Sequence, residues 1–263
     1  MLRTFRILLL LYVAGFSKFA DAAEAVDLLL ILASDVSRSV DHKKFELQRA
    51  GYASAIVDNQ VIKAITGGPN RRIAVSFVEW SGVEAQRLVI DWTMIDDAVA
   101  ARKFGNQLLE LPRSFAGRTS ISGGIDYAIT VFSSAPYQSG RRTIDVSGDG
   151  TNNSGRAVNL ARDDAVAAGI TINGLVILSN SPLNWNPEHT HPPGGLANYY
   201  RTNVIGGPSS FVMVAENFDS FSQAIRKKLI AEIADVTSLS GTDRAIEETR
   251  RRARVTSLET GTF

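Results

Sequence analysis

The chain lacks cysteine, contains only three histidines, and carries almost no net charge, with 28 Lys plus Arg against 27 Asp plus Glu. Without cysteine it can form no disulfide, thiolate zinc site, iron–sulfur cluster or cysteine nucleophile. A net charge of +1 offers no basic surface of the kind that binds phosphate backbones, so we expect no nucleic-acid partner. The remaining composition, 44% hydrophobic over 263 residues, suits one large α/β domain or two small ones.

The first 22 residues have the pattern of an export signal. Arg3 and Arg6 precede an apolar run of about ten residues, which is shorter than the roughly twenty that a membrane anchor needs. Ala20-Asp21-Ala22 then offers the small side chains that signal peptidase reads, so we expect cleavage near Ala22. The leader carries three basic residues and one acidic residue, and its removal lowers the net charge to −1. We expect a periplasmic or secreted bacterial protein with no stable membrane insertion after cleavage, because an exported chain without cysteine suits the periplasm.

After the leader, short apolar runs alternate with amphipathic stretches. The expected strands cover 26–34, 71–82, 86–92, 141–148, 170–178 and 211–217, and the expected helices cover 41–59, 95–111, 120–132, 156–169 and 218–236. Strands regularly followed by helices predict right-handed βαβ units. We therefore expect one doubly wound α/β domain over about 24–238, with a mostly parallel central sheet of about six strands, one antiparallel edge strand, and helices on both faces.

Two segments do not fit this sheet. The stretch 179–209 is rich in Pro, Gly and Asn and is longer than an ordinary connection, which predicts a functional or mobile loop. The tail 239–263 has many charges and no apolar stripe, so we expect it to be disordered or a frayed helix.

Oxygen-bearing side chains gather at three places where the predicted fold brings loops together. Asp35, Ser37 and Ser39 follow the first strand, Thr119 precedes a helix, and Asp149 ends a strand between two glycines that let the backbone turn sharply. In an open α/β sheet, ligands bind beyond the carboxyl ends of the parallel strands. Two carboxylates and three hydroxyls at that edge would form a ligand set for a hard cation.

Each of these residues also has an ordinary structural interpretation. Ser39 or Asp41 can cap the helix that follows, Thr119 can cap the helix at 120–132, and Asp35 and Asp149 can each fix a turn. Taken singly the structural interpretations are the commoner ones. Because all five positions fall on equivalent strand ends or loops, a shared metal site is favoured.

At this point the chain resembles the von Willebrand factor type A domain with its metal-ion-dependent adhesion site. The resemblance covers about 24–238 and rests on Asp35, Ser37, Ser39, Thr119 and Asp149, although a glycine stands before Asp149 where the family usually has threonine. The long loop and the segment that follows it look like those of an uncharacterised exported bacterial subgroup.

The resemblance implies a binding device. In the family, the two serines would bind the ion directly, the threonine directly or through water, and the aspartates mostly through waters. The implied ion is Mg²⁺, with Mn²⁺ or Ca²⁺ as alternatives, and its open position would be filled by an Asp or Glu carboxylate of a protein partner. The implied function is a metal-dependent adhesion or scaffold module, not an enzyme.

Further residues are candidates for contact with a partner or for another chemistry. Arg38, Arg118, Asn152 and Trp185 flank the predicted site and are candidate partner contacts. The competing function is a metal-dependent hydrolase that uses the same ion together with His189 and His191 from the long loop. We favour a solvated loop for this His-x-His pair, because two alternate histidines make a poor zinc site. Other expectations are a solvent-facing His42 and core positions for Trp80 and Trp92.

Overall fold

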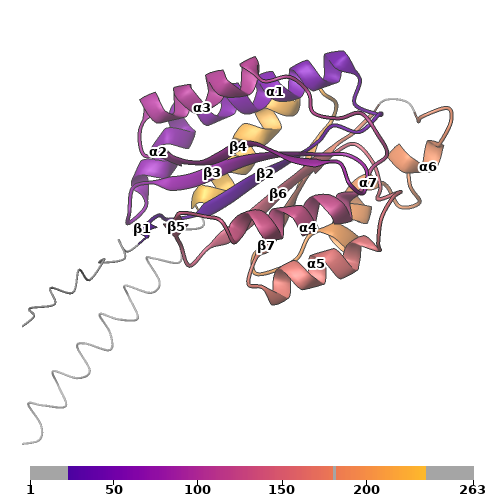
Figure 1. Cartoon of the computed structure of the whole chain (residues 1–263). Coiled ribbons are helices and arrows are strands. Elements are labelled where there is room, and N and C mark those ends of the chain that lie inside the picture. The colour runs from indigo at the N-terminus through magenta and orange to yellow at the C-terminus, as the bar shows by residue number, and fades with distance from the viewer. Residues whose placement is uncertain (1–22, 180–181, 235–263) are drawn as a thin grey trace, which may run out of the picture.

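The computed structural model describes residues 23–179 and 182–234, which form three layers with a sheet between two layers of helices (Figure 1). The expected leader (1–22) and tail (239–263) lie outside the described residues. Within the described part, no helix is both long and apolar enough to cross a bilayer.

The central sheet has six strands in the order β4-β3-β2-β6-β7-β8. Their bounds are β2 (Leu29–Asp35), β3 (Ile73–Trp80), β4 (Gln86–Ile95), β6 (Arg142–Gly148), β7 (Thr171–Ile177) and β8 (Val212–Ala215). Only β4 runs antiparallel to its neighbour, and it lies at one edge. This confirms the predicted mostly parallel sheet with one antiparallel edge strand. The chain order reverses between β2 and β6, which places the ends of these two strands at the switch point where such folds bind ligands.

Helices cover both faces of the sheet, as predicted (Figure 1). One face is covered by α1 (His42–Ile56), α2 (Asn59–Gly67), α3 (Ala98–Glu110) and the helix over 221–234. The other is covered by α4 (Ile121–Phe132), α5 (Val158–Ala167), α7 (Leu196–Tyr199) and the π-helical turn η1 (Tyr200–Val204). Alternate residues of the buried strands supply the two cores: Phe77 packs toward the first layer and Val78 toward the second.

Several element boundaries differ from the sequence prediction, and helix caps explain two of them. The helix predicted over 41–59 is two helices, because the Asp58 carboxylate accepts a hydrogen bond from Gln60 N (2.8 Å) and starts α2. The helix predicted from Ile95 begins later because Asp97 caps it, which leaves Ile95 as the last residue of β4. A two-residue parallel pair that was not predicted joins β1 (Glu24–Ala25) to β5 (Tyr137–Gln138).

The described residues of the segment 182–209 contain short helices that the sequence analysis did not predict. Besides α7 and η1 the segment contains α6 (Pro187–Thr190), which lies beyond the carboxyl ends of the strands (Figure 1). Trp80 and Trp92 are buried as expected, and the Trp92 indole donates to Val131 O (3.1 Å).

Candidate metal centre

The three predicted loops meet at the carboxyl edge of the sheet. Asp35 is the last residue of β2, and Asp149 directly follows the neighbouring strand β6. The Ser39 hydroxyl donates to Asp149 Oδ1 (2.5 Å) and lies 3.1 Å from the hydroxyl of Ser37. Thr119 lines the same cavity as Ser39. The structure thus brings all five sequence-predicted residues to one place.

The helices α1 and α4 are capped by Asp41 and Ser120, the neighbours of the predicted ligands, and not by Ser39 or Thr119. Asp41 caps α1 by accepting from Lys44 N (2.9 Å), and Ser120 caps α4 by accepting from Gly123 N (3.1 Å). The hydroxyls of Ser39 and Thr119 are therefore available to the shared site.

The two carboxylates are buried, and nearby groups offset their negative charge only in part. Asp35 and Asp149 are both 0% exposed, and within the described part of the chain the Oδ2 atom of each has no hydrogen-bond partner. Burial, reinforced by the nearby Asp149, raises the pKa of Asp35 to about 8, and burial also raises the pKa of Asp149. Lys44 Nζ is 3.6 Å from Asp149 Oδ2 and is partly exposed. A divalent cation among these oxygens would remove the repulsion between the carboxylates, so the residues present fit such an ion.

An arginine that the sequence analysis missed binds the backbone of the first loop, which carries Asp35, Ser37 and Ser39. Arg113 Nη2 donates to the carbonyl oxygens of Val36 (2.6 Å) and Ser37 (2.8 Å). The backbone N–H of Arg38 donates to Gly117 O (2.9 Å), which joins the first loop to the second. An arginine in a polar connection carries no pattern that distinguishes it, because its partners are backbone carbonyls distant in sequence.

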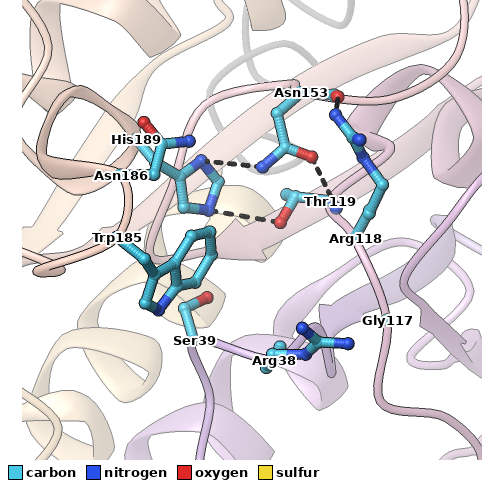
Figure 2. Close-up of a pocket in the computed structure, with 9 residues that line it drawn as sticks. All are labelled: Arg38, Ser39, Gly117, Arg118, Thr119, Asn153, Trp185, Asn186 and His189. Carbon is cyan, nitrogen blue, oxygen red and sulfur yellow. Dashed lines mark hydrogen bonds between the residues drawn. The ribbon is translucent and has the colours of Figure 1, made fainter.

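His189 corrects the expectation of a solvated His-x-His loop. It is 1% exposed, and its Nε2 lies 3.2 Å from Thr119 Oγ1. Figure 2 marks this contact with a dashed line. Its Nδ1 lies 3.3 Å from both Thr151 Oγ1 and Asn153 Nδ2. Burial lowers the pKa of His189. The ring is therefore a fixed part of the site.

The second histidine of the pair does not join it. His191 is exposed, and its Nδ1 is 2.9 Å from Thr190 Oγ1. His42 is exposed as expected and pairs with Glu46 on α1. The two-histidine arrangement that the hydrolase alternative requires is therefore not assembled at this cavity.

The glycines beside Asp149 do not form the sharp turn that the sequence analysis predicted. Neither Gly148 nor Gly150 has a positive φ. A Cβ on Gly150 would overlap the imidazole of His189, and one on Gly148 would press on the Tyr200 hydroxyl. These glycines allow the long loop to approach the site closely.

A cavity of about 310 Å³ opens above the hydroxyls (Figure 2). Its lining is Arg38, Ser39, Gly117, Arg118, Thr119, Asn153, Trp185, Asn186 and His189. Two of these side chains are cationic and none is acidic. Trp185 is 61% exposed and stacks on His189 with ring centroids 6.4 Å apart.

Asn152, a predicted partner contact, does not line this cavity. Its Oδ1 accepts from Ser122 N at the start of α4 (3.1 Å), and its Nδ2 donates to Arg156 O. Asn153 occupies the expected place, where it accepts from Thr119 N (3.0 Å) and receives a hydrogen bond from the Arg118 guanidinium. No group of three or more His, Asp or Glu suited to a metal is found among the residues the structure describes. Metal binding here would thus depend on the hydroxyls as well as on the carboxylates.

The family model described as Protein of unknown function (DUF1194) matches residues 25–237. The chain belongs to this family. No curated protein matches it in sequence.

Solved structures show the fold of this DUF1194 member. The mussel byssus proximal thread matrix protein 1 with a zinc-occupied MIDAS motif aligns with a TM-score of 0.54 and 18% identity, covering 80% of this chain and 49% of that one. A von Willebrand factor type A protein from Catenulispora acidiphila aligns with a TM-score of 0.52 and 16% identity, covering 80% and 43%. The pilus adhesin SpaC from Lactobacillus rhamnosus GG aligns with a TM-score of 0.57 and 11% identity, covering 81% and 31%. The chain thus spans less than half the length of each, and the comparison confirms the von Willebrand factor A fold.

Proposed function

We propose that this domain is an exported, metal-dependent protein-binding module of the adhesion or scaffold type. The observation that carries the proposal is the pair of buried carboxylates, Asp35 and Asp149, beside the hydroxyls of Ser37 and Ser39. The Oδ2 atom of each carboxylate accepts no hydrogen bond from a described residue. Buried carboxylates without partners are costly, and a bound cation would offset that cost. Thr119 completes the proposed ligand set from the second loop.

The proposed ion is Mg²⁺, with Mn²⁺ and Ca²⁺ as alternatives. The proposed donors are all oxygen atoms, which hard divalent cations prefer. Three of the five donors are neutral hydroxyls, so much of the ion's charge would remain to attract an external ligand. The zinc-occupied MIDAS of the mussel protein is a property of that protein, and a metal titration would show which ion this chain prefers.

The proposed partner presents an Asp or Glu carboxylate to the ion. The cavity above the site has a volume of about 310 Å³, which leaves room for an inserted Asp or Glu side chain. Arg38 and Arg118 line it without an acidic residue among them, so a negative group is favoured over a positive one. The exposed indole of Trp185 would pack against the partner beside the inserted group.

The test measures ion binding by titration calorimetry and by thermal melting. We expect Mg²⁺ or Mn²⁺ to raise the melting temperature of the mature domain, because an ion that binds only the folded state stabilises it by about 2.7 kcal/mol at 100 times its Kd. Asp149→Ala should abolish this shift. Asp163→Ala, which changes an exposed aspartate on α5, is the matched control and should retain it.

The same two variants then serve in a pull-down from periplasmic extract, with Mg²⁺ or with chelator. We expect capture of a partner by the wild type and by Asp163→Ala only in the presence of the ion. Equal ion binding by wild type and Asp149→Ala would contradict the proposed site, and partner capture that persists in chelator would contradict the proposed mode of binding.

A further inference from the structure

The hydrogen bonds around Asn153 determine which way its side-chain amide faces. Its Oδ1 accepts from the backbone N–H of Thr119 (3.0 Å), so its Nδ2 is the atom that faces His189 Nδ1 at 3.3 Å. An amide nitrogen can only donate. His189 Nδ1 must therefore be an acceptor, and it also lies within reach of the Thr151 hydroxyl (3.3 Å).

This arrangement fixes the tautomer of the buried imidazole. With Nδ1 accepting, the neutral ring carries its proton on Nε2. Nε2 lies 3.2 Å from Thr119 Oγ1, and so it donates to that hydroxyl. One lone pair of Thr119 Oγ1 is then used by His189, which leaves the other lone pair for a cation and the hydroxyl proton for a carboxylate.

We propose that His189 is a positioning residue for the metal centre: it orients the Thr119 hydroxyl toward the ion and keeps the ligand set free of nitrogen. This inference rests on the proposed function. A nitrogen that carries its proton cannot bind a metal, so the ring acts on the ion only through Thr119. Groups that orient metal ligands by a hydrogen bond typically change affinity about 10–100-fold when removed.

The surrounding contacts hold the ring in this role. The carbonyl oxygen of His189 accepts from Thr151 N (2.9 Å), which ties its backbone to the loop that carries Asp149. Gly150 gives the ring room, since any larger side chain there would collide with it. Trp185 stacks on its outer face (Figure 2). The backbone hydrogen bond to Thr151 and the stacked Trp185 ring thus hold His189 in place, in the space that Gly150 leaves open.

The experiment compares His189→Leu with His189→Gln in the full mature domain. A glutamine carboxamide offers one donor side and one acceptor side, like the imidazole, whereas leucine offers neither. His191→Ala, on the same segment but exposed, is the control. Affinities for Mg²⁺ and for Zn²⁺ are measured by calorimetry, and unfolding in chelator reports the stability of each ion-free variant.

We expect His189→Leu to weaken the binding of both ions by similar factors of about 10–100, His189→Gln to recover most of that loss, and His191→Ala to bind as the wild type does. Unchanged or tighter Mg²⁺ binding by His189→Leu would overturn the proposed role. A loss confined to Zn²⁺ would also overturn it, because it would make His189 a direct ligand. If His189→Leu does not fold, failure of the folded His189→Gln to bind Mg²⁺ within about tenfold of wild type would count against the role.

These results separate the two levels of the proposal. A wild-type protein that binds neither ion would overturn the metal site and the role of His189 with it. A wild-type protein that binds Mg²⁺ while His189→Leu binds equally well would overturn only the role of His189.

Discussion

Two clusters of buried carboxylates lie along the same sheet, and the protein compensates them in different ways. At the carboxyl edge, the cations near Asp35 and Asp149 are only partly buried: Lys44 Nζ lies 3.6 Å from Asp149 Oδ2, and the charge of Arg113 acts on Asp35. Deeper in the molecule, Asp145 of β6 and Glu232 of the helix over 221–234 share one ammonium group. Lys228 Nζ lies 2.8 Å from Asp145 Oδ1 and is also hydrogen-bonded to Glu232 Oε1.

The difference indicates which cluster is structural. Lys228 is 0% exposed and pairs with both Asp145 and Glu232, so the interior cluster holds its cation inside the fold. It joins the last described helix to the central strand β6. The edge cluster is covered instead by a cavity and a loop, which leaves access for a small cation. Where the chain supplies a fully buried cation, the cluster stabilises the fold. Where its cations are partly exposed and a cavity lies above the carboxylates, the cluster can bind an ion.

The largest expected effect comes from removing the interior cation. Lys228→Met leaves Asp145 and Glu232 buried together without an opposite charge. Breaking a buried ion pair from one side typically costs about 3–5 kcal/mol, and we expect a loss of that size in urea unfolding at pH 8. Added Mg²⁺ should not restore the loss.

Lys44→Met is the matched control at the edge. Because Lys44 is partly exposed, its loss should cost less than about 1 kcal/mol in chelator. If Lys228→Met were as mild as Lys44→Met, the distinction between a structural cluster and a binding cluster would fail.

Much of the fold can be predicted from the sequence because its signals are local. The apolar run within 26–34 marks a strand buried on both faces, and the Gly-Asp-Gly segment marks a strand end. The missed helix α2 also had local signals, namely Asp58 as a cap followed by Val61 and Ile65 on one face. Reading 41–59 as a single helix hid them.

In the candidate site, too, the residues with local sequence signals could be predicted, and those that depend on long-range contacts could not. Its five oxygen-bearing residues could be predicted because each follows a strand or precedes a helix within its own loop. The contributions of Arg113 and His189 could not, because they depend on contacts across 77 and 70 positions of sequence. Asn152 and Asn153 are chemically identical neighbours, and only the tertiary path of the loop decides that Asn153 faces the cavity.

A smaller effect should follow from changing how the loop that carries His189 packs against the carboxyl edge of the sheet. Gly150→Ala places a methyl group where the His189 ring now lies, so the ring must move. We expect a loss of about 1–3 kcal/mol, typical of an overpacked site, together with weaker Mg²⁺ binding. Gly140→Ala meets nothing within 4 Å and should change the free energy of unfolding by less than about 0.5 kcal/mol. A Gly150→Ala protein with wild-type Mg²⁺ affinity would show that loop packing and ion binding at the edge are independent.

A separate expected effect is a change in how stability depends on pH. Burial, together with Glu232, raises the pKa of Asp145 to about 7 despite Lys228, whereas an unfolded aspartate titrates near about 3.9. Between these values the folded state holds a proton that the unfolded state has lost. This contribution to stability is therefore full below about pH 4 and is lost as the pH rises through about 7.

Asp145→Asn has no proton to lose at this position. Its free energy of unfolding, measured in urea with chelator from pH 4 to pH 8, should fall less steeply than that of the wild type. Asp35 and Asp149 remain in both proteins, so the difference between the two curves isolates the interior cluster. Parallel curves would mean that Lys228 keeps Asp145 ionised throughout this range. The interior ammonium would then compensate its carboxylates fully, and the contrast with the edge pair would be sharper still.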